Sequence, residues 1–219
     1  MRRTLGRSTA ALVCVVLLAA CGSDDTEEKA AGVCEAPSAS EEAVFLREIL
    51  QTEAFTTDQR KPKDELVRKL KRDLRSLPPD RDTFHHLACR FATASDTGYA
   101  GANFSYAWMP RTAPRKPLIG DDVAYDVNGV RVVAGATMAK LLVPCDMPGD
   151  LVEQSQKADL YTDVYFHFVR SEPDRSQAGK DKRAALTYLV TRHITDALGC
   201  ENRPLEQPPT VKPLPAPTP

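Results

Sequence analysis

The stretch VAYDVNGVRVV, residues 123–133, decides the fold class of this chain. Two runs rich in β-branched residues flank Asn128-Gly129, the pair most typical of a two-residue hairpin connection. Such a type I′ turn requires positive φ at both central positions, which asparagine and glycine tolerate. The sequence therefore predicts an antiparallel hairpin, and with it an antiparallel sheet.

Three more strands are predicted around this hairpin: residues 104–109, residues 136–143 after Gly135, and residues 160–169. In residues 160–169 the side chains divide into two sets at alternate positions. One face would carry apolar residues against a core, namely Leu160, Thr162, Val164, Phe166 and Phe168. The other face is expected to meet water and carries Tyr161, Asp163, Tyr165 and His167. The chain thus predicts a sheet of four or five strands with one open face.

Helical patterns lie on both sides of the strand region. Phe45, Leu46, Ile49 and Leu50 form an apolar stripe at helical spacing after Ser38, a candidate N-cap, and residues 63–76 are expected to form an amphipathic helix. A short third helix is predicted around residues 84–91, and a long one ends at Leu198 before Gly199. Together these elements predict an α+β fold with N-terminal helices and a long C-terminal helix packed on the sheet.

The N-terminal sequence is typical of an export signal. Three arginines precede an apolar run at residues 10–20, which ends in Leu18-Ala19-Ala20-Cys21. This tetrapeptide resembles a lipobox, which implies that Cys21 is lipidated; an ordinary cleaved signal is the alternative. We expect residues 1–20 to be a signal peptide, 21–33 a flexible tether, 34–203 one domain and 204–219 a proline-rich disordered tail.

Four cysteines remain for the domain: Cys34, Cys89, Cys145 and Cys200. An even number in an exported chain indicates two disulfides, for which three pairings exist. Cys145 ends a predicted strand and Cys200 follows the last helix, so an antiparallel return of that helix would bring them together. We therefore predict the pairs Cys34–Cys89 and Cys145–Cys200.

No recognisable catalytic motif is present in the sequence: it contains no GxSxG, P-loop, GxGxxG or SxxK. His85 and Cys89 have a metal-chelating spacing on the predicted third helix, but a disulfide at Cys89 would remove that ligand. A chain beginning at Cys21 has a formal net charge of −4, unlike a nucleic-acid-binding surface. We assign no catalytic residue, no metal and no cofactor.

The best candidate for a binding surface is the glycine-containing segment at residues 97–109. It carries four aromatic residues, Tyr99, Phe104, Tyr106 and Trp108. Aromatic side chains in such a loop can form a ligand platform or a protein-binding hot spot. The alternative is that they belong to the first core strand, with Trp108 as an anchor under the sheet.

The lipobox and the stretch GATMAKLLVPCDMPG at residues 135–149, followed by a strand and a helix ending Leu198-Gly199-Cys200, resemble small secreted lipoproteins of actinobacteria. Most of these have no assigned function. The resemblance implies a lipid-anchored domain on the outer face of the cytoplasmic membrane and a Cys145–Cys200 disulfide.

We expect a non-enzymatic module that binds an envelope protein or another envelope component. The alternative is a small-ligand-binding lipoprotein associated with a transporter. A third reading, an envelope hydrolase, would need a deep pocket that holds His167 with an acidic neighbour such as Asp163.

Overall fold

The computed structural model describes residues 32–93, 99–114, 117–169 and 171–215, and the side chain of Tyr99 is not among them. The predicted signal peptide, the lipidation site Cys21 and most of the predicted tether lie outside these ranges.

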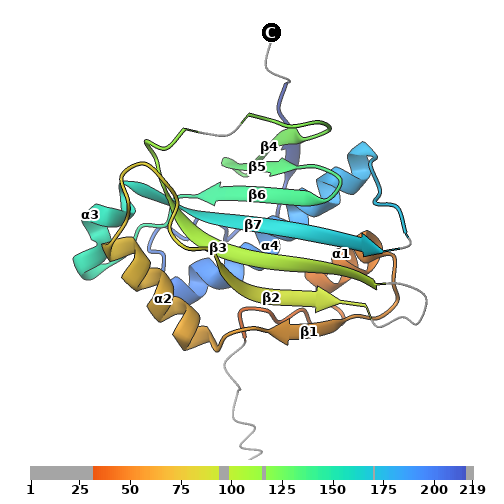
Figure 1. The fold of residues 1–219 in the computed structure, drawn as a ribbon, viewed down its shortest axis with the longest axis horizontal. Helices are drawn as coiled ribbons and strands as arrows, with labels where there is room; N and C mark the ends of the chain where they lie inside the picture. The colour runs from red at the N-terminus through yellow and green to blue at the C-terminus, as the bar shows by residue number, and fades with distance from the viewer. Residues whose placement is uncertain (1–31, 94–98, 115–116, 170, 216–219) are drawn as a thin grey trace, which may run out of the picture. The chain divides into compact units, whose positions relative to one another are not determined.

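A single antiparallel sheet of eight strands forms the framework, in the order β1-β2-β3-β7-β6-β5-β4-β8 (Figure 1). Its strands are β1 (Thr56–Gln59), β2 (His86–Ala92), β3 (Tyr99–Pro110), β4 (Val123–Val127), β5 (Val130–Ala134), β6 (Met138–Val143), β7 (Ala158–Val169) and β8 (Val211–Pro213). The predicted count of four or five strands is therefore too low. The five predicted strands are the contiguous centre of the sheet, β3-β7-β6-β5-β4, and the three others extend its edges.

The helices are α1 (Glu41–Leu50), α2 (Lys63–Arg75), α3 (Val152–Ser155) and α4 (Gln177–Leu198), with a 3-10 turn, η1, at Gly149–Leu151. In Figure 1 α4 passes behind the sheet, against β4 to β7, and α1 packs on α4. The α+β class and the long C-terminal helix on the sheet are confirmed. The N-cap of α1 is Ser40 rather than Ser38, because the Ser40 hydroxyl accepts a hydrogen bond from the Ala43 amide at 3.2 Å.

The hairpin and the alternating strand have the expected local geometry. Asn128 and Gly129 adopt φ values of 52° and 83°, as a type I′ turn requires, and β4 pairs with β5 across them. Along β7, Leu160, Thr162 and Val164 are fully buried on the α4 side. The sheet consequently has one face under helices and one face turned away from them.

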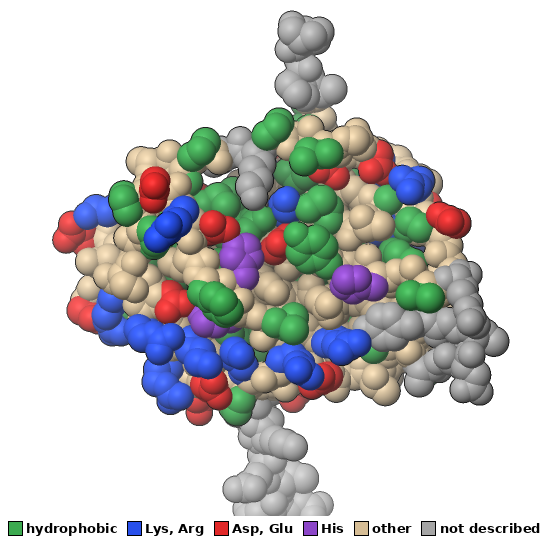
Figure 2. Space-filling view, in the orientation of Figure 1, with side chains coloured by type: hydrophobic (Ala, Val, Ile, Leu, Met, Phe, Trp, Pro, Cys, Tyr) green, Lys and Arg blue, Asp and Glu red, His purple; other side chains and the backbone are tan. Residues whose placement is uncertain are grey.

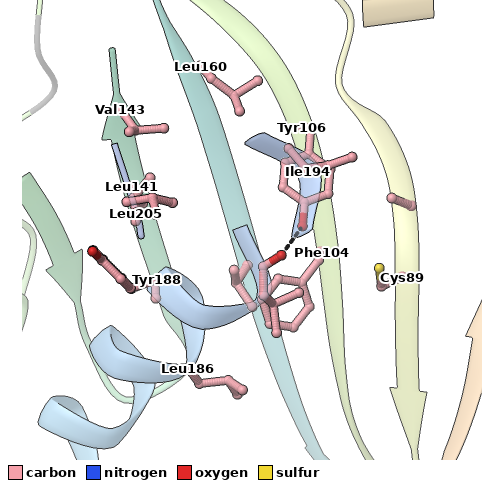
Figure 3. Close-up of a cluster of buried hydrophobic side chains, with 14 of the residues drawn as sticks. Cys89, Phe104, Tyr106, Leu141, Val143, Leu160, Leu186, Tyr188, Ile194 and Leu205 are labelled. Carbon is pink, nitrogen blue, oxygen red and sulfur yellow. Dashed lines mark hydrogen bonds between the residues drawn. The ribbon is translucent and has the colours of Figure 1, made fainter. Parts of the chain in front are cut away.

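The core lies between the sheet and the helices. In Figure 3, side chains of β3, β6 and β7 meet α4, and the Tyr106 hydroxyl donates to the Val190 carbonyl at 3.5 Å. The Trp108 indole is fully buried, and its Nε1 donates to the Leu70 carbonyl of α2 at 2.9 Å. Trp108 therefore anchors α2 beneath the sheet, as one of the two sequence-based alternatives proposed.

Both predicted disulfides are present. Cys34 and Cys89 have Cα atoms 5.3 Å apart, and Cys145 and Cys200 have Cα atoms 4.9 Å apart. The first disulfide joins the segment before α1 to β2. The second joins the residues just after β6 to the residue just after the C-cap of α4. Each half of the domain thus contains one disulfide.

Two predictions for individual segments are wrong. Residues 86–92 form strand β2 instead of the expected short helix, and Phe84, placed in the core by that helix, is 73% exposed. A short apolar run is compatible with the periodicity of a helix and with that of a strand. Hydrogen bonding to β1 and β3 makes this segment a strand. The segment after residue 203, expected to be a disordered tail, buries Leu205 and adds Val211–Pro213 to the edge of β4.

Candidate functional site

A solvent-open pocket of about 700 Å³ lies on the face of the sheet that points away from α4. Figure 2 views this face, where hydrophobic, acidic, basic and histidine side chains gather above β5, β6 and β7. Four neighbouring strands supply the floor: β3, β7, β6 and β5. Their contributing residues are Ser105, Met109, Tyr161, Asp163, Tyr165, Lys140, Leu142, Arg131 and Val133.

The register of the strands sets the middle of the floor. Asp163 on β7 lies opposite Ser105 on β3 and opposite Lys140 on β6. Lys140 in turn lies opposite Val133 on β5. Directly opposite residues of an antiparallel pair share a face, so these four side chains form one row across the floor. The hydrogen-bonded sheet therefore fixes an acid beside a base at the centre of the pocket.

Two chain segments remote in sequence form the walls. The segment before β2 contributes Asp80, Arg81, Asp82 and His85, and the residues between β3 and β4 contribute Ala113, Pro114, Pro117, Leu118, Ile119 and Asp122. The Ile119 amide donates to Asp122 Oδ2 at 3.2 Å. A Cβ atom at Gly135 would collide with the Asp122 carboxylate, so this glycine permits the wall to approach the β5–β6 turn. One wall is mixed in charge, and the other is largely apolar.

His85 lies between two carboxylates at the mouth of the pocket. Its Nε2 is 2.5 Å from Asp82 Oδ2, and its Nδ1 is 4.0 Å from Asp163 Oδ2. The ring also meets Tyr161 edge-on, with centroids 5.4 Å apart. Both ring nitrogens therefore face acidic oxygens, and the imidazole links the wall to the floor.

The acidic centre acts on the neighbouring phenols. The negative charge of Asp163, followed by burial and a hydrogen bond to the same carboxylate, raises the pKa of Tyr165. Burial raises the pKa of Tyr161, and the charge of Asp163 adds to this effect. The Tyr165 hydroxyl donates a hydrogen bond to Asp163 and can accept one from a bound molecule, whereas the protonated Tyr161 hydroxyl can donate to such a molecule.

Arg131 and Lys140 provide the positive charge of the floor. Neither side chain takes part in any of the ion pairs found among the described residues. Val133 lies opposite Lys140, and Arg131 lies two positions before Val133 on the same face. Arg131 is therefore a diagonal neighbour of Lys140. Diagonal neighbours of this kind are about 7–8 Å apart at their backbones. Two long cationic side chains can therefore converge on one group in the pocket.

The predicted aromatic binding surface is corrected by the structure. Phe104, Tyr106 and Trp108 are fully buried on the α4 side of β3, so they belong to the core. The side chain of Tyr99, the fourth member, lies outside the described residues. Every second residue of a strand lies on the same face of the sheet, and these three residues of β3 lie on the face covered by α4.

The sequence-predicted histidines divide between the pocket and its surroundings. His167 does not line the pocket; its Nε2 is 3.0 Å from the Asn103 amide nitrogen. His85 does line the pocket, and Cys89 lies on β2 in the predicted disulfide, so the metal-chelating spacing of these two residues is not realised. The polar alternation of β7 was the signal for Tyr161, Asp163 and Tyr165.

Within the described ranges, no group of three or more acidic, histidine or cysteine side chains is arranged to hold a metal ion. Nor does any helix in the same ranges have the length and apolar character needed to cross a membrane. Searches of protein-family models, of curated proteins and of solved structures found no match to this chain.

Proposed function

We propose that this chain is a non-enzymatic, lipid-anchored extracytoplasmic protein that binds a small molecule in the pocket on the open face of its sheet. The observation that carries the proposal is the pocket itself. Its volume of about 700 Å³ falls within the roughly 300–1,000 Å³ typical of small-molecule sites. An apolar wall together with a few converging polar groups is also the usual composition of such sites.

The orientation of His85 favours binding over hydrolysis. A histidine that activates a hydroxyl nucleophile needs one ring nitrogen directed at that hydroxyl. Here Nε2 faces Asp82 and Nδ1 faces Asp163, although Ser105 also lines the pocket. The imidazole is thus suited to hold the wall against the floor and to present a polar edge to a ligand.

The proposed location rests on the N-terminal sequence and on the cysteines. An apolar run ending in Leu18-Ala19-Ala20-Cys21 is typical of a lipoprotein signal. Two disulfides in the domain support an oxidising compartment outside the cytoplasm. Lipidation of Cys21 would then attach the domain to the outer face of the cytoplasmic membrane.

Native mass spectrometry of the intact protein, extracted gently from the membranes of its own cells, tests this function. We expect a stoichiometric small-molecule adduct. The variant Leu142→Trp fills the pocket floor and should lose the adduct, whereas Val152→Trp, on exposed α3, should keep it. Melting curves establish that both variants fold. A wild-type protein without an adduct, or an adduct retained by folded Leu142→Trp, would contradict the proposal.

A further inference from the structure

We infer that the ligand is an organic anion with a single negative group, held by Arg131 and Lys140, and an apolar body that lies along Leu118 and Ile119. This inference rests on the proposed small-molecule function of the pocket and names the chemical class of its ligand. The lining carries four carboxylates and three cationic side chains, so the ligand class follows from which of these charges already have partners and not from the net charge.

The acidic groups of the lining are engaged by the protein. Asp82 is 2.5 Å from the His85 ring, and Asp122 accepts from the Ile119 amide. Asp163 lies near His85 and forms a hydrogen bond with Tyr165. Asp80 and Arg81 are both exposed and lie at the edge of the lining, away from the floor. The carboxylates therefore serve mainly to hold the walls and the phenols in place.

The cations of the floor are available instead. In the strand register Arg131 lies opposite Asp126 and Lys140 lies opposite Asp163, yet neither cation forms an ion pair among the described residues, and the two occupy diagonal positions on β5 and β6. A guanidinium and an ammonium that approach the same point suit a carboxylate, a sulfonate or a phosphate, with which they form charge-assisted hydrogen bonds. These three groups all present anionic oxygens, which would lie above β5 and β6.

The apolar wall and the acidic centre define the rest of the ligand. Ile119 is 68% exposed, so a hydrocarbon that covers it would gain the free energy of removing that surface from water. Asp163 lies opposite Lys140, so a second anionic group would meet this carboxylate after Arg131 and Lys140, the two cations of the floor, are already engaged by the first. A single negative group with an apolar body, and at most neutral hydroxyls near Tyr161 and Tyr165, matches this distribution.

Three probes with the same ten-carbon chain test the inference: decanoate, 1-decanol and decyltrimethylammonium. Calorimetric titration of the full-length protein below micelle-forming concentrations measures their affinities. We expect decanoate to bind most tightly. The variant Arg131→Gln/Lys140→Gln should lower decanoate affinity at least about tenfold and leave 1-decanol affinity nearly unchanged. The control Arg68→Gln/Lys212→Gln removes the same charge from exposed positions outside the pocket and should bind decanoate like the wild type.

The outcomes separate this inference from the function on which it rests. Equal affinities for the three probes, a preference for decyltrimethylammonium, or unchanged decanoate binding by the folded pocket variant would overturn the anion assignment alone. The pocket would then still bind small molecules of another class. Failure of all three probes to bind the wild-type protein would overturn the anion assignment and count against the proposed function as well.

Discussion

Asp163 on β7 and Lys140 on β6 occupy directly opposite positions of the sheet, on the face that points away from α4. The same carboxylate is 4.0 Å from the His85 ring of the pocket wall, and it raises the pKa of Tyr165 beside it. One acidic side chain therefore organises the centre of the pocket, and its effect on its neighbours can be measured directly.

Asp163→Asn removes the charge that acts most strongly on Tyr165. Because that charge favours the protonated phenol, we expect the pKa of Tyr165 to fall towards the ordinary value of about 10. A pH titration of the Tyr165 ring resonances by NMR measures the change. Asp159→Asn, on the same strand but outside the pocket, serves as the control and should leave the Tyr165 titration unaltered. An unchanged pKa in Asp163→Asn would contradict the described geometry.

Glu42 joins α1 to α4. Its Oε1 lies 3.4 Å from both Arg192 Nη2 and His193 Nε2, and its side chain is only 7% exposed. His193 contributes most to lowering the pKa of Glu42 to about 2. We expect Glu42→Gln to lower the free energy of unfolding at pH 7 by about 1–3 kcal/mol. Chemical denaturation measures this loss, with exposed Glu41→Gln as the control.

The pH dependence of this loss has a definite sign. A carboxyl group whose pKa is depressed on folding stabilises the native state above its ordinary pKa of about 4.5 and loses that contribution as the pH falls towards 2. The difference between the wild type and Glu42→Gln should therefore shrink as the pH falls from about 4.5 towards 2. A difference that grew on acidification would refute the assigned role of Glu42.

The two disulfides each close a sequence separation of 55 residues. In the chain-entropy model, equal loops contribute equally, so removal of either bond should cost a similar free energy, roughly 2–4 kcal/mol. The paired variants are Cys34→Ala/Cys89→Ala and Cys145→Ala/Cys200→Ala, compared by chemical denaturation. If one variant retained wild-type stability while the other did not, the entropic account of that bond would be wrong.

The membrane anchor makes a separate prediction at the N-terminus. If Cys21 is lipidated, Cys21→Ala removes the acyl chains that hold the domain at the membrane, and the protein should move to the soluble extracellular fraction or stay as unprocessed precursor. Cys14→Ala lies inside the predicted signal peptide and should leave localisation unchanged. Membrane fractionation with immunodetection compares the two, and normal processing and retention of Cys21→Ala would contradict the anchor.

The central sheet could be predicted because its strands carry strong local signals. The Asn128-Gly129 turn and the alternation along residues 160–169 each specify structure over a short range. The edge strands lack such signals: β1 is TTDQ with every residue exposed, and β8 follows a proline-rich stretch. These segments become strands through hydrogen bonds with neighbours already in place, which local sequence does not reveal.

The pocket could be predicted only in part. Alternation along β7 correctly put Tyr161, Asp163 and Tyr165 on one face, but the expectation that all three meet water is wrong: Tyr161 and Asp163 are each only 7% exposed, and only Tyr165 is exposed. The walls could not be predicted, because residues 80–85 and 117–122 meet over the floor only after the sheet has formed. His85 reached the site for the same reason: its neighbour Asp163 is 78 positions away in the chain.

The most direct measurement is an NMR titration of the folded domain with decanoate, followed through its backbone amide resonances. The account predicts saturable shifts concentrated at Arg131, Lys140, residues 161–165 and residues 117–122, which are the floor and the apolar wall of the pocket. Shifts confined to α2 or to the covered face of the sheet, or no saturable shifts at all, would contradict the claim that this pocket holds an organic anion.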